Sequence, residues 1–158
     1  GCHMLSRWGP MCVKFSDQGL KALYFDDDPD HRGWVDGVFR EAFLKWLGAF
    51  QLMSPANQWE QLAPEGSVYQ KSVWRKLLSC PLGATQTYGQ VAADLGTPGA
   101  ARAVGSAVAA NGICLLIPCH RIVMASGRTG KYRWGADRKL ALLDAERRDG
   151  CDLVSLFL

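Results

Sequence analysis

Two helix-start signals ten residues apart place the strongest constraint on the fold of this chain. Thr87 is followed three residues later by Gln90, which predicts a capping box at the start of a helix that ends before Gly96. Thr97-Pro98 predicts a second start, with Thr97 as the cap and Pro98 at the first helical position, where its missing N–H costs nothing. Two helices joined by about three residues form a helix-turn-helix.

The second of these helices, residues 99–111, consists almost wholly of small residues around one charge, Arg102. Small side chains favour two interpretations: a helix packed tightly inside the protein, or a helix whose backbone approaches DNA closely. Arg102 favours DNA, because a long cation near a helix start can reach into a groove and a helix N-terminus attracts phosphate.

The charge is distributed unevenly along the chain. Residues 1–65 hold 6 basic and 9 acidic side chains, whereas residues 66–158 hold 12 and 6, within a chain of net charge +3. The second part is therefore suited to a polyanion, although a solvated basic face fits the same numbers. No apolar run approaches the roughly 20 residues that cross a bilayer, so we expect a soluble protein.

The first part predicts a small mixed unit. Residues 11–25 predict a hairpin around the turn Asp17-Gln18-Gly19, residues 26–30 an acidic loop, and residues 34–50 an amphipathic helix. The segment 53–66 is rich in turn residues, so we place a domain boundary there, between residues 4–65 and residues 66–158. Residues 1–3 resemble a vector remnant and are set aside.

The second part begins with a predicted packing helix, residues 69–79, and later brings a thiol and an imidazole together. The apolar run 113–117 predicts a buried extended segment that leads to Cys119 and His120. A thiolate is the reactive form of cysteine, and a thiol of pKa about 8.5 needs a nearby base to form it. An inert buried cysteine is the alternative interpretation. Neighbouring side chains in a strand point to opposite sides, so a water or a local turn must connect the Cys119 thiol to the His120 imidazole.

The closing helix, residues 136–148, offers a carboxylate for the imidazole. Glu146 lies on its apolar side, four residues after Leu142 and three after Leu143, where an unpaired charge is costly. An edge position with an arginine partner is the alternative.

The cysteines indicate a reducing compartment. With six cysteines, no C-x-x-C pair and no export signal, we expect reduced thiols in the cytoplasm.

Residues 66–150 together resemble the O6-alkylguanine-DNA alkyltransferases. The matching motifs are Tyr69-Gln70 with Val73-Trp74, Thr87-Tyr88-Gly89-Gln90-Val91-Ala92, Ala100-Ala101-Arg102-Ala103-Val104-Gly105, Asn111, Ile117-Pro118-Cys119-His120-Arg121-Ile122-Val123, Tyr132-Arg133-Trp134-Gly135 and Arg138-Lys139 with Leu142-Leu143.

This resemblance implies roles for several residues. Cys119 would accept the alkyl group, His120 would act as base through a water, and Glu146 would hold His120. Asn111 would brace the segment, and Tyr88 would donate a proton to the leaving guanine.

The resemblance also implies how DNA is held. Arg102 would fill the stack vacated by a flipped base, from a helix in the minor groove, with Thr87, Ala101 and Ser106 at the DNA. Tyr132 and the Arg133 backbone would form the guanine pocket. The partner would be double-stranded DNA with O6-alkylguanine, and O4-alkylthymine as a further substrate, bound by a monomer without cofactor. Lys131 departs from the familiar loop, which leaves the preferred alkyl size open.

The implied fold is α+β: a small ribonuclease-H-like domain, then a mainly helical domain with a winged-helix-like helix-turn-helix. Some members of the family hold zinc in the first domain, but the candidate ligands here show no recognisable ligand spacing, so we expect no metal; they are Cys2, His3, Cys12 and His31. Two other classes remain open. One is a protein that binds alkylated bases without repair, which would lack the acceptor Cys119, and the other is a cysteine hydrolase, which would turn over.

Overall fold

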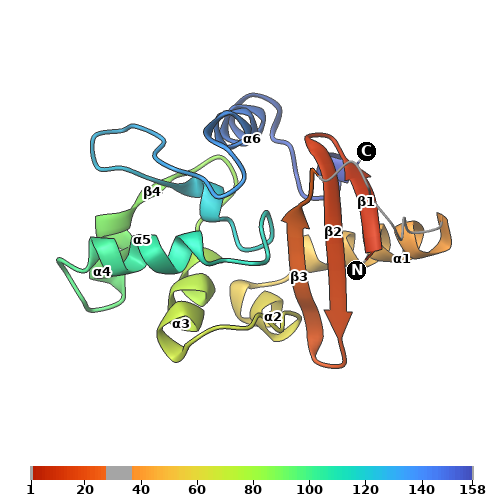
Figure 1. The fold of residues 1–158 in the computed structure, drawn as a ribbon, viewed down its shortest axis with the longest axis horizontal. Helices are drawn as coiled ribbons and strands as arrows, with labels where there is room; N and C mark the ends of the chain where they lie inside the picture. Colours follow the sequence, from red (N-terminus) through yellow and green to blue (C-terminus); the bar gives the residue numbers. More distant parts are fainter. Residues whose placement is uncertain (1, 28–36, 158) are drawn as a thin grey trace.

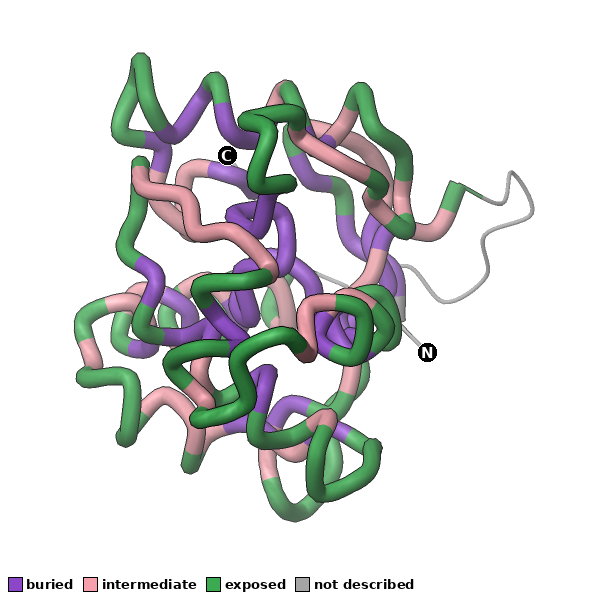
Figure 2. Tube along the Cα trace, turned by 90° about the vertical axis from the view of Figure 1, so that its left-hand side faces the viewer, coloured by how far each residue is buried: buried purple, intermediate pink, exposed green. Residues whose placement is uncertain are grey.

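We describe residues 2–27 and 37–157 in a computed structural model of the chain (Figure 1). A three-stranded sheet lies on one side of the molecule and a group of helices on the other, so both helices and strands are present, as predicted. Buried residues gather in the middle of the molecule and exposed residues at its periphery (Figure 2). None of the described helices combines the length and the apolar character needed to span a bilayer.

The predicted hairpin is confirmed, and a third strand joins it. Strands β2 (Gly9–Ser16) and β3 (Gly19–Phe25) pair antiparallel, and β1 (Cys2–Ser6) pairs with the other edge of β2. Strand β1 includes residues that we had set aside from the sequence. A strand of five residues at a chain end gives little periodicity, and only its pairing with β2 defines it.

Helix α1 (Gly37–Gln51) confirms the predicted amphipathic helix, although residues 34–36 lie outside the described residues, as do His31 and the end of the predicted acidic loop. Phe43, Leu47 and Phe50 form its buried face. Helix α2 (Pro55–Glu60) lies where we expected only turns. The sequence did contain helix-start signals here: the Ser54 side chain accepts a hydrogen bond from the Asn57 amide, and Pro55 occupies the first helical position.

The first helices of the second part agree closely with their patterns. Helix α3 (Val68–Leu77) has a capping box at Ser67 that we did not anticipate. Strand β4 (Gln86–Thr87) then leads into α4 (Tyr88–Asp94). The capping box predicted at Thr87 is confirmed, because its Oγ1 accepts from the Gln90 amide at 3.1 Å and Gln90 Oε1 accepts from the Thr87 amide at 2.9 Å.

The helix start predicted at Thr97-Pro98 is wrong. Helix α5 (Ala101–Ala109) begins three residues later, without a side-chain cap. The Thr97 hydroxyl instead donates to the Ala92 carbonyl at 3.2 Å, and Gly99 has φ +90°, a left-handed conformation that interrupts a right-handed helix. Helices α4 and α5 nevertheless pack against each other.

The run 113–117 is buried, as predicted, but it is not extended. Its middle residue Leu115 has φ +72°, and the Ile117 amide donates to the Ile113 carbonyl at 3.2 Å, so the segment forms a tight turn. The apolar composition indicated burial correctly, but short apolar runs do not distinguish strands from other buried backbone. The turn ends at the one-turn helix η1 (Cys119–Arg121), which continues into β5 (Ile122–Val123).

The closing helix α6 (Ala136–Asp149) confirms the prediction within one residue and ends at Gly150 in the left-handed conformation. The chain then returns to the first part through η2 (Ser155–Phe157), where the Arg7 amide donates to the Leu156 carbonyl and Phe157 packs edge-on against Phe43. The Leu23 amide also donates to the Gly112 carbonyl. Backbone hydrogen bonds therefore connect the parts on either side of residue 65, and the boundary there stays a prediction.

Candidate functional site

The nucleophile candidate Cys119 opens the helix η1 and is 3% exposed. Strand β5, directly after this helix, pairs in parallel with β4, so that Thr87 lies opposite Val123. This pairing brings the start of α4, and with it Tyr88, to the segment that carries Cys119. The two motifs that the sequence singled out are therefore joined by backbone hydrogen bonds.

The Asn111 side chain ties together the turn that precedes the thiol. This fully buried amide donates to the carbonyls of Ile113 at 3.2 Å and Ile117 at 3.1 Å, and its oxygen accepts from the Ile113 amide at 2.9 Å. These bonds satisfy a buried polar side chain and fix the left-handed turn at Leu115. The turn in turn sets where η1 begins.

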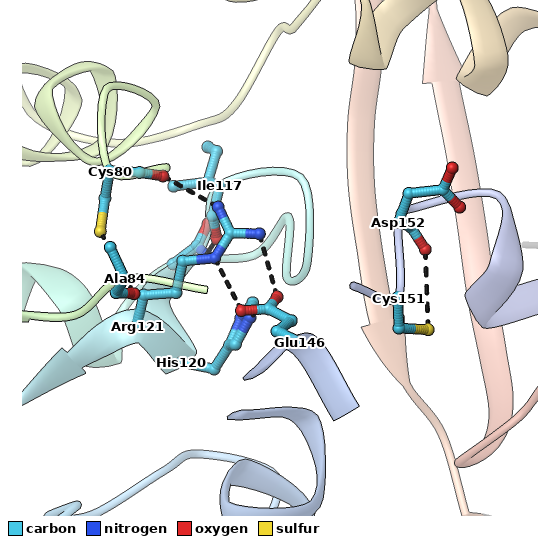
Figure 3. Close-up of polar contacts among 9 residues, drawn as sticks. Cys80, Ala84, Ile117, His120, Arg121, Glu146, Cys151 and Asp152 are labelled. Carbon is cyan, nitrogen blue, oxygen red and sulfur yellow. Dashed lines mark hydrogen bonds and ion pairs between the residues drawn. The ribbon is translucent and has the colours of Figure 1, made fainter. Parts of the chain in front are cut away.

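Helix α6 brings Glu146 to the imidazole that follows the thiol. His120 Nε2 and Glu146 Oε1 lie 2.6 Å apart, and both side chains are almost fully buried. Arg121 donates to both oxygens of the same carboxylate, at 3.0 and 2.9 Å, and to the Cys80 carbonyl at 2.9 Å (Figure 3). Both partners that the sequence left open for Glu146, the imidazole and an arginine, are present.

These contacts set the protonation of the pair. Burial pushes the pKa of Glu146 upward, but hydrogen bonds from His120 and Arg121 outweigh it and lower the pKa to about 2. Burial lowers the pKa of His120 in spite of the carboxylate, so the imidazole is neutral at neutral pH. An ionised carboxylate only accepts, so Nε2 carries the proton and Nδ1 keeps a lone pair. Among the described residues, Nδ1 has no hydrogen-bond partner.

Lys139 is a functional candidate that the sequence analysis did not single out. This side chain is fully buried, and its Nζ donates to the carbonyls of Ile122 at 2.6 Å and Lys131 at 3.4 Å. Burial lowers its pKa to about 8, and interaction with Cys119 raises it. A signal was available, because Lys139 precedes Leu142 by three residues and Leu143 by four, which is the spacing that identified Glu146.

The thiol itself remains protonated without help. Burial raises the pKa of Cys119, while hydrogen bonding by Asn111 and the charge of Lys139 lower it only in part. Besides Asn111, four buried polar side chains belong to the segments around the thiol. We call these four the buried polar cluster: His120, Arg121, Lys139 and Glu146. A base and a cation therefore lie beside a thiol that needs both.

Cys119 lines a cavity of about 890 Å³. Of the residues predicted for the pocket, Tyr88, Tyr132 and Arg133 line it, and of those predicted at DNA, Ala101, Arg102 and Ser106 do. Asn111, His120 and Glu146 lie in the interior instead, and the Thr87 side chain caps α4. Burial, and then the neighbouring Cys119, raise the pKa of Tyr88 and of Tyr132, so both hydroxyls keep their protons.

Helix α5 has one buried face and one exposed face. Val104, Ala107 and Val108 are buried, and the Trp74 indole donates to the Ala107 carbonyl at 2.8 Å. We call the other side the α5 face; it consists of Arg102, Ala103, Ser106 and Ala109, all exposed. Within the described part of the chain, no hydrogen bond or ion pair engages Arg102. The packed-helix interpretation therefore holds for the buried face, and for the exposed α5 face the approach to DNA stays a prediction.

Comparison with known proteins identifies the family. The family described as 6-O-methylguanine DNA methyltransferase, DNA binding domain, matches residues 68–148. The methylated-DNA–protein-cysteine methyltransferase of Mycolicibacterium paratuberculosis is 40% identical over 82% of this chain and 79% of its own length, and that of Mycobacterium leprae is 38% identical over 94% and 93%.

A solved structure is similar to this chain over most of its length. The crystal structure of Mycobacterium tuberculosis OGT in complex with DNA superposes with a TM-score of 0.73 at 34% identity, covering 92% of this chain and 91% of that one. Since the family match spans half of the chain and a relative is 38% identical over nearly all of it, the resemblance drawn from the sequence is confirmed. The chain belongs to the methylated-DNA–protein-cysteine methyltransferase family.

Proposed function

We propose that this chain repairs DNA by transferring an alkyl group from O6 of guanine, and as a second substrate from O4 of thymine, to Sγ of Cys119. One observation carries the proposal. Cys119 lines a cavity of about 890 Å³, and the neutral imidazole next to it in the chain is held by the ionised Glu146. Family membership supports the same chemistry.

The reaction begins with a proton transfer. The Cys119 thiol passes its proton through a bridging water to Nδ1 of His120, the nitrogen whose lone pair is open, and Glu146 stabilises the imidazolium that forms. The Lys139 ammonium stabilises the thiolate in the same low-polarity surroundings, where charges interact strongly. A thiol with a pKa raised by burial thus becomes reactive only when this machinery acts on it.

The thiolate then attacks the alkyl carbon in line with the C–O bond. The S–C bond forms as the C–O bond breaks, the bonding electrons go to guanine, and a proton supplied from the Tyr88 hydroxyl, and finally from the thiol, leaves guanine neutral. The product is a thioether, which has no good leaving group, so each molecule reacts once. No organic cofactor takes part in these steps.

The target base must leave the duplex to reach the cavity, at a cost of a few kcal/mol. We propose that the α5 face enters the minor groove of double-stranded DNA, with Ala101 and Ser106 close to the backbone and the start of α4 at Thr87 beside it. Arg102, which lines the cavity and is free of other partners among the described residues, fills the vacated stack. Tyr132 and the Arg133 backbone then contact the flipped base.

We propose that the working form is a cytoplasmic monomer. The division into a ribonuclease-H-like unit, residues 4–65, and a winged-helix-like unit, residues 66–158, belongs to the same proposal. Cys12, Cys80, Cys114, Cys119 and Cys151 are free, which suits a reducing compartment.

Mass spectrometry of the protein after incubation with duplex DNA that contains O6-methylguanine tests the proposal. We expect one added methylene, about 14 Da, on the peptide that carries Cys119 and none on Cys151, at no more than one per molecule. Unmodified protein that binds the duplex would instead indicate recognition without repair. Continued release of product beyond one equivalent would indicate a hydrolase, and either result contradicts the proposal.

A further inference from the structure

Arg138, near the start of α6, contacts segments from both parts of the chain. Its Nε donates to the Trp8 carbonyl at 3.1 Å, in the turn between β1 and β2. Its Nη1 and Nη2 bind the two oxygens of Asp27, at 3.2 and 3.0 Å, and Nη1 also donates to the Trp134 carbonyl at 3.0 Å. Every nitrogen of the guanidinium is therefore engaged.

The packing around this guanidinium is close. Its central carbon lies 4.1 Å from the centre of the Phe25 ring, a cation–π distance. Gly9, the first residue of β2, has φ +128°, and a Cβ added there would lie 2.9 Å from Nη2, so the absence of a side chain at Gly9 leaves room for Arg138. The Arg138 side chain is 17% exposed. The Asp27 side chain is 65% exposed, so the ion pair itself adds little stability, but its two-pronged geometry together with the carbonyl and ring contacts fixes the position of the guanidinium.

The same contact reaches the wall of the cavity that contains Cys119. Trp134 and Tyr132 both line this cavity. The Trp134 ring packs edge-on against Phe25 of the sheet, with centroids 6.4 Å apart, and against Tyr132 at 5.4 Å. Arg138 holds the carbonyl of Trp134 and stacks on Phe25, so it fixes this wall to the N-terminal sheet.

We infer that Arg138 is a positioning residue through which the N-terminal sheet sets how large an alkyl group the cavity accepts. This inference rests on the proposed alkyl transfer. Arg138 does not touch the reacting atoms; it acts through the position of Trp134. A wall that is held in place resists the displacement that a bulky group requires, whereas a methyl group requires none.

The test compares two substrates in one variant. Arg138→Gln keeps a polar side chain but loses the fork and the charge, and Asp27→Asn removes one partner. We expect the ratio of the rate constants for O6-benzylguanine and O6-methylguanine, in the same duplex, to rise up to about tenfold in Arg138→Gln, the discrimination that small shape changes give in apolar pockets. Asp27→Asn should raise it less, and Arg138→Lys should lie closer to the wild type.

Arg148→Gln is the matched control, because Arg148 lies on the same helix in an exposed pair with Asp144. We expect it to leave the ratio unchanged. A general loss of stability would lower both rate constants by the same factor. An unchanged or lowered ratio in Arg138→Gln therefore overturns the inference while leaving the proposed transfer in place.

Hydrogen exchange decides the inference without any transfer. We expect the amides of residues 131–135, which include the Gly135 amide bonded to the Tyr132 carbonyl, to exchange several-fold faster in Arg138→Gln and at the wild-type rate in Arg148→Gln. Equal exchange in Arg138→Gln and the wild type would overturn it. A wild-type protein that fails to alkylate would contradict the proposed function separately.

Discussion

The protein interior next to the cavity and the outer rim of the cavity contain opposite kinds of side chain. On the inside, the buried polar cluster and Asn111 account for five of the seven buried polar or charged side chains among the described residues. Each member of the cluster has a partner at hydrogen-bond distance. At the rim, the α5 face carries small exposed side chains and Arg102, which has no such partner within the described ranges.

We expect this difference to separate the chemical step from DNA recognition. Buried charges are retained only where their partners are exact in number and geometry, so a change inside should affect the chemical step and stability together. An exposed side chain without partners contributes little to folding, so a change at the rim should affect DNA binding and base flipping but not stability. The predictions below measure whether the two regions are separable in this way.

Cys119→Ser should have the largest effect. We expect alkyl transfer to fall below detection, because a hydroxyl is a far weaker nucleophile than a thiolate, while affinity for duplex DNA stays within about twofold. Mass spectrometry and gel-shift titration of the same samples measure the two quantities. Cys151→Ser, outside the cavity, is the control and should transfer normally. If Cys119→Ser lost DNA affinity while Cys151→Ser kept it, the buried residues and the α5 face would not be separable in function.

Glu146→Gln should come next. It keeps the shape but leaves Arg121 without its counter-ion and removes the negative charge that stabilises the His120 imidazolium. We therefore expect a transfer rate about 100-fold lower and a loss of about 3 kcal/mol in the free energy of unfolding. Single-turnover kinetics and urea unfolding measure both. Asp144→Asn, on the exposed side of the same helix, should change neither. A stable Glu146→Gln protein with a wild-type rate would remove His120 from the proton transfer.

The same pair predicts how stability depends on pH. The folded protein holds the pKa of Glu146 at about 2, below the ordinary value of 4.5, so the stabilisation from this group is complete above about pH 4.5 and is lost as the pH falls toward 2. The unfolding free energy of the wild type should therefore fall between pH 5 and pH 3 by more than that of Glu146→Gln, which lacks this carboxylate. Urea midpoints measured at both pH values give the comparison. Equal acid sensitivity in both proteins would mean that other carboxyl groups dominate.

The sequence predicted these regions unequally, for identifiable reasons. Glu146 was found because a carboxylate on an apolar helix face needs a partner, and Thr87 because a capping box is a local interaction. Lys139 satisfies the same helical spacing as Glu146, but its partners are backbone carbonyls of residues 122 and 131, which no local pattern reveals. The turn at Leu115 depends on Asn111, whose hydrogen bonds span six residues.

The predicted start of α5 was wrong because a local signal was present but was overridden by other interactions. Thr97-Pro98 carries a valid local signal, but the left-handed Gly99 and the bond from Thr97 to Ala92 override it. Strand β1 exists only through its pairing with β2. Local rules therefore predicted most helices and the residues around Cys119, whereas contacts distant in the chain decided the exceptions, including the link from Arg138 to the sheet.

Lys139→Met should have a smaller effect on transfer than Glu146→Gln. It removes a buried cation but leaves a side chain of similar length, so we expect a rate about thirtyfold lower, corresponding to about 2 kcal/mol of lost thiolate stabilisation. The pH dependence of Cys119 alkylation by iodoacetamide should move to higher pH, because the charge of Lys139 lowers the thiol pKa. Lys45→Met, which changes an exposed lysine on α1, is the control. An unshifted profile would show that Lys139 only supports the fold.

Arg102→Ala should have the smallest effect, and it tests the rim alone. We expect transfer from duplex DNA to slow about tenfold, because base flipping loses the side chain that fills the stack, while transfer from a single-stranded oligonucleotide stays nearly unchanged. Affinity should depend less steeply on salt if Arg102 also neutralises a phosphate. Arg128→Ala, an exposed arginine outside the cavity, should behave as the wild type. The unfolding free energy should not change, since Arg102 has no partner within the described residues. Equal slowing on single and double strands would place Arg102 in the chemical step, and the separation of inside from rim would then fail.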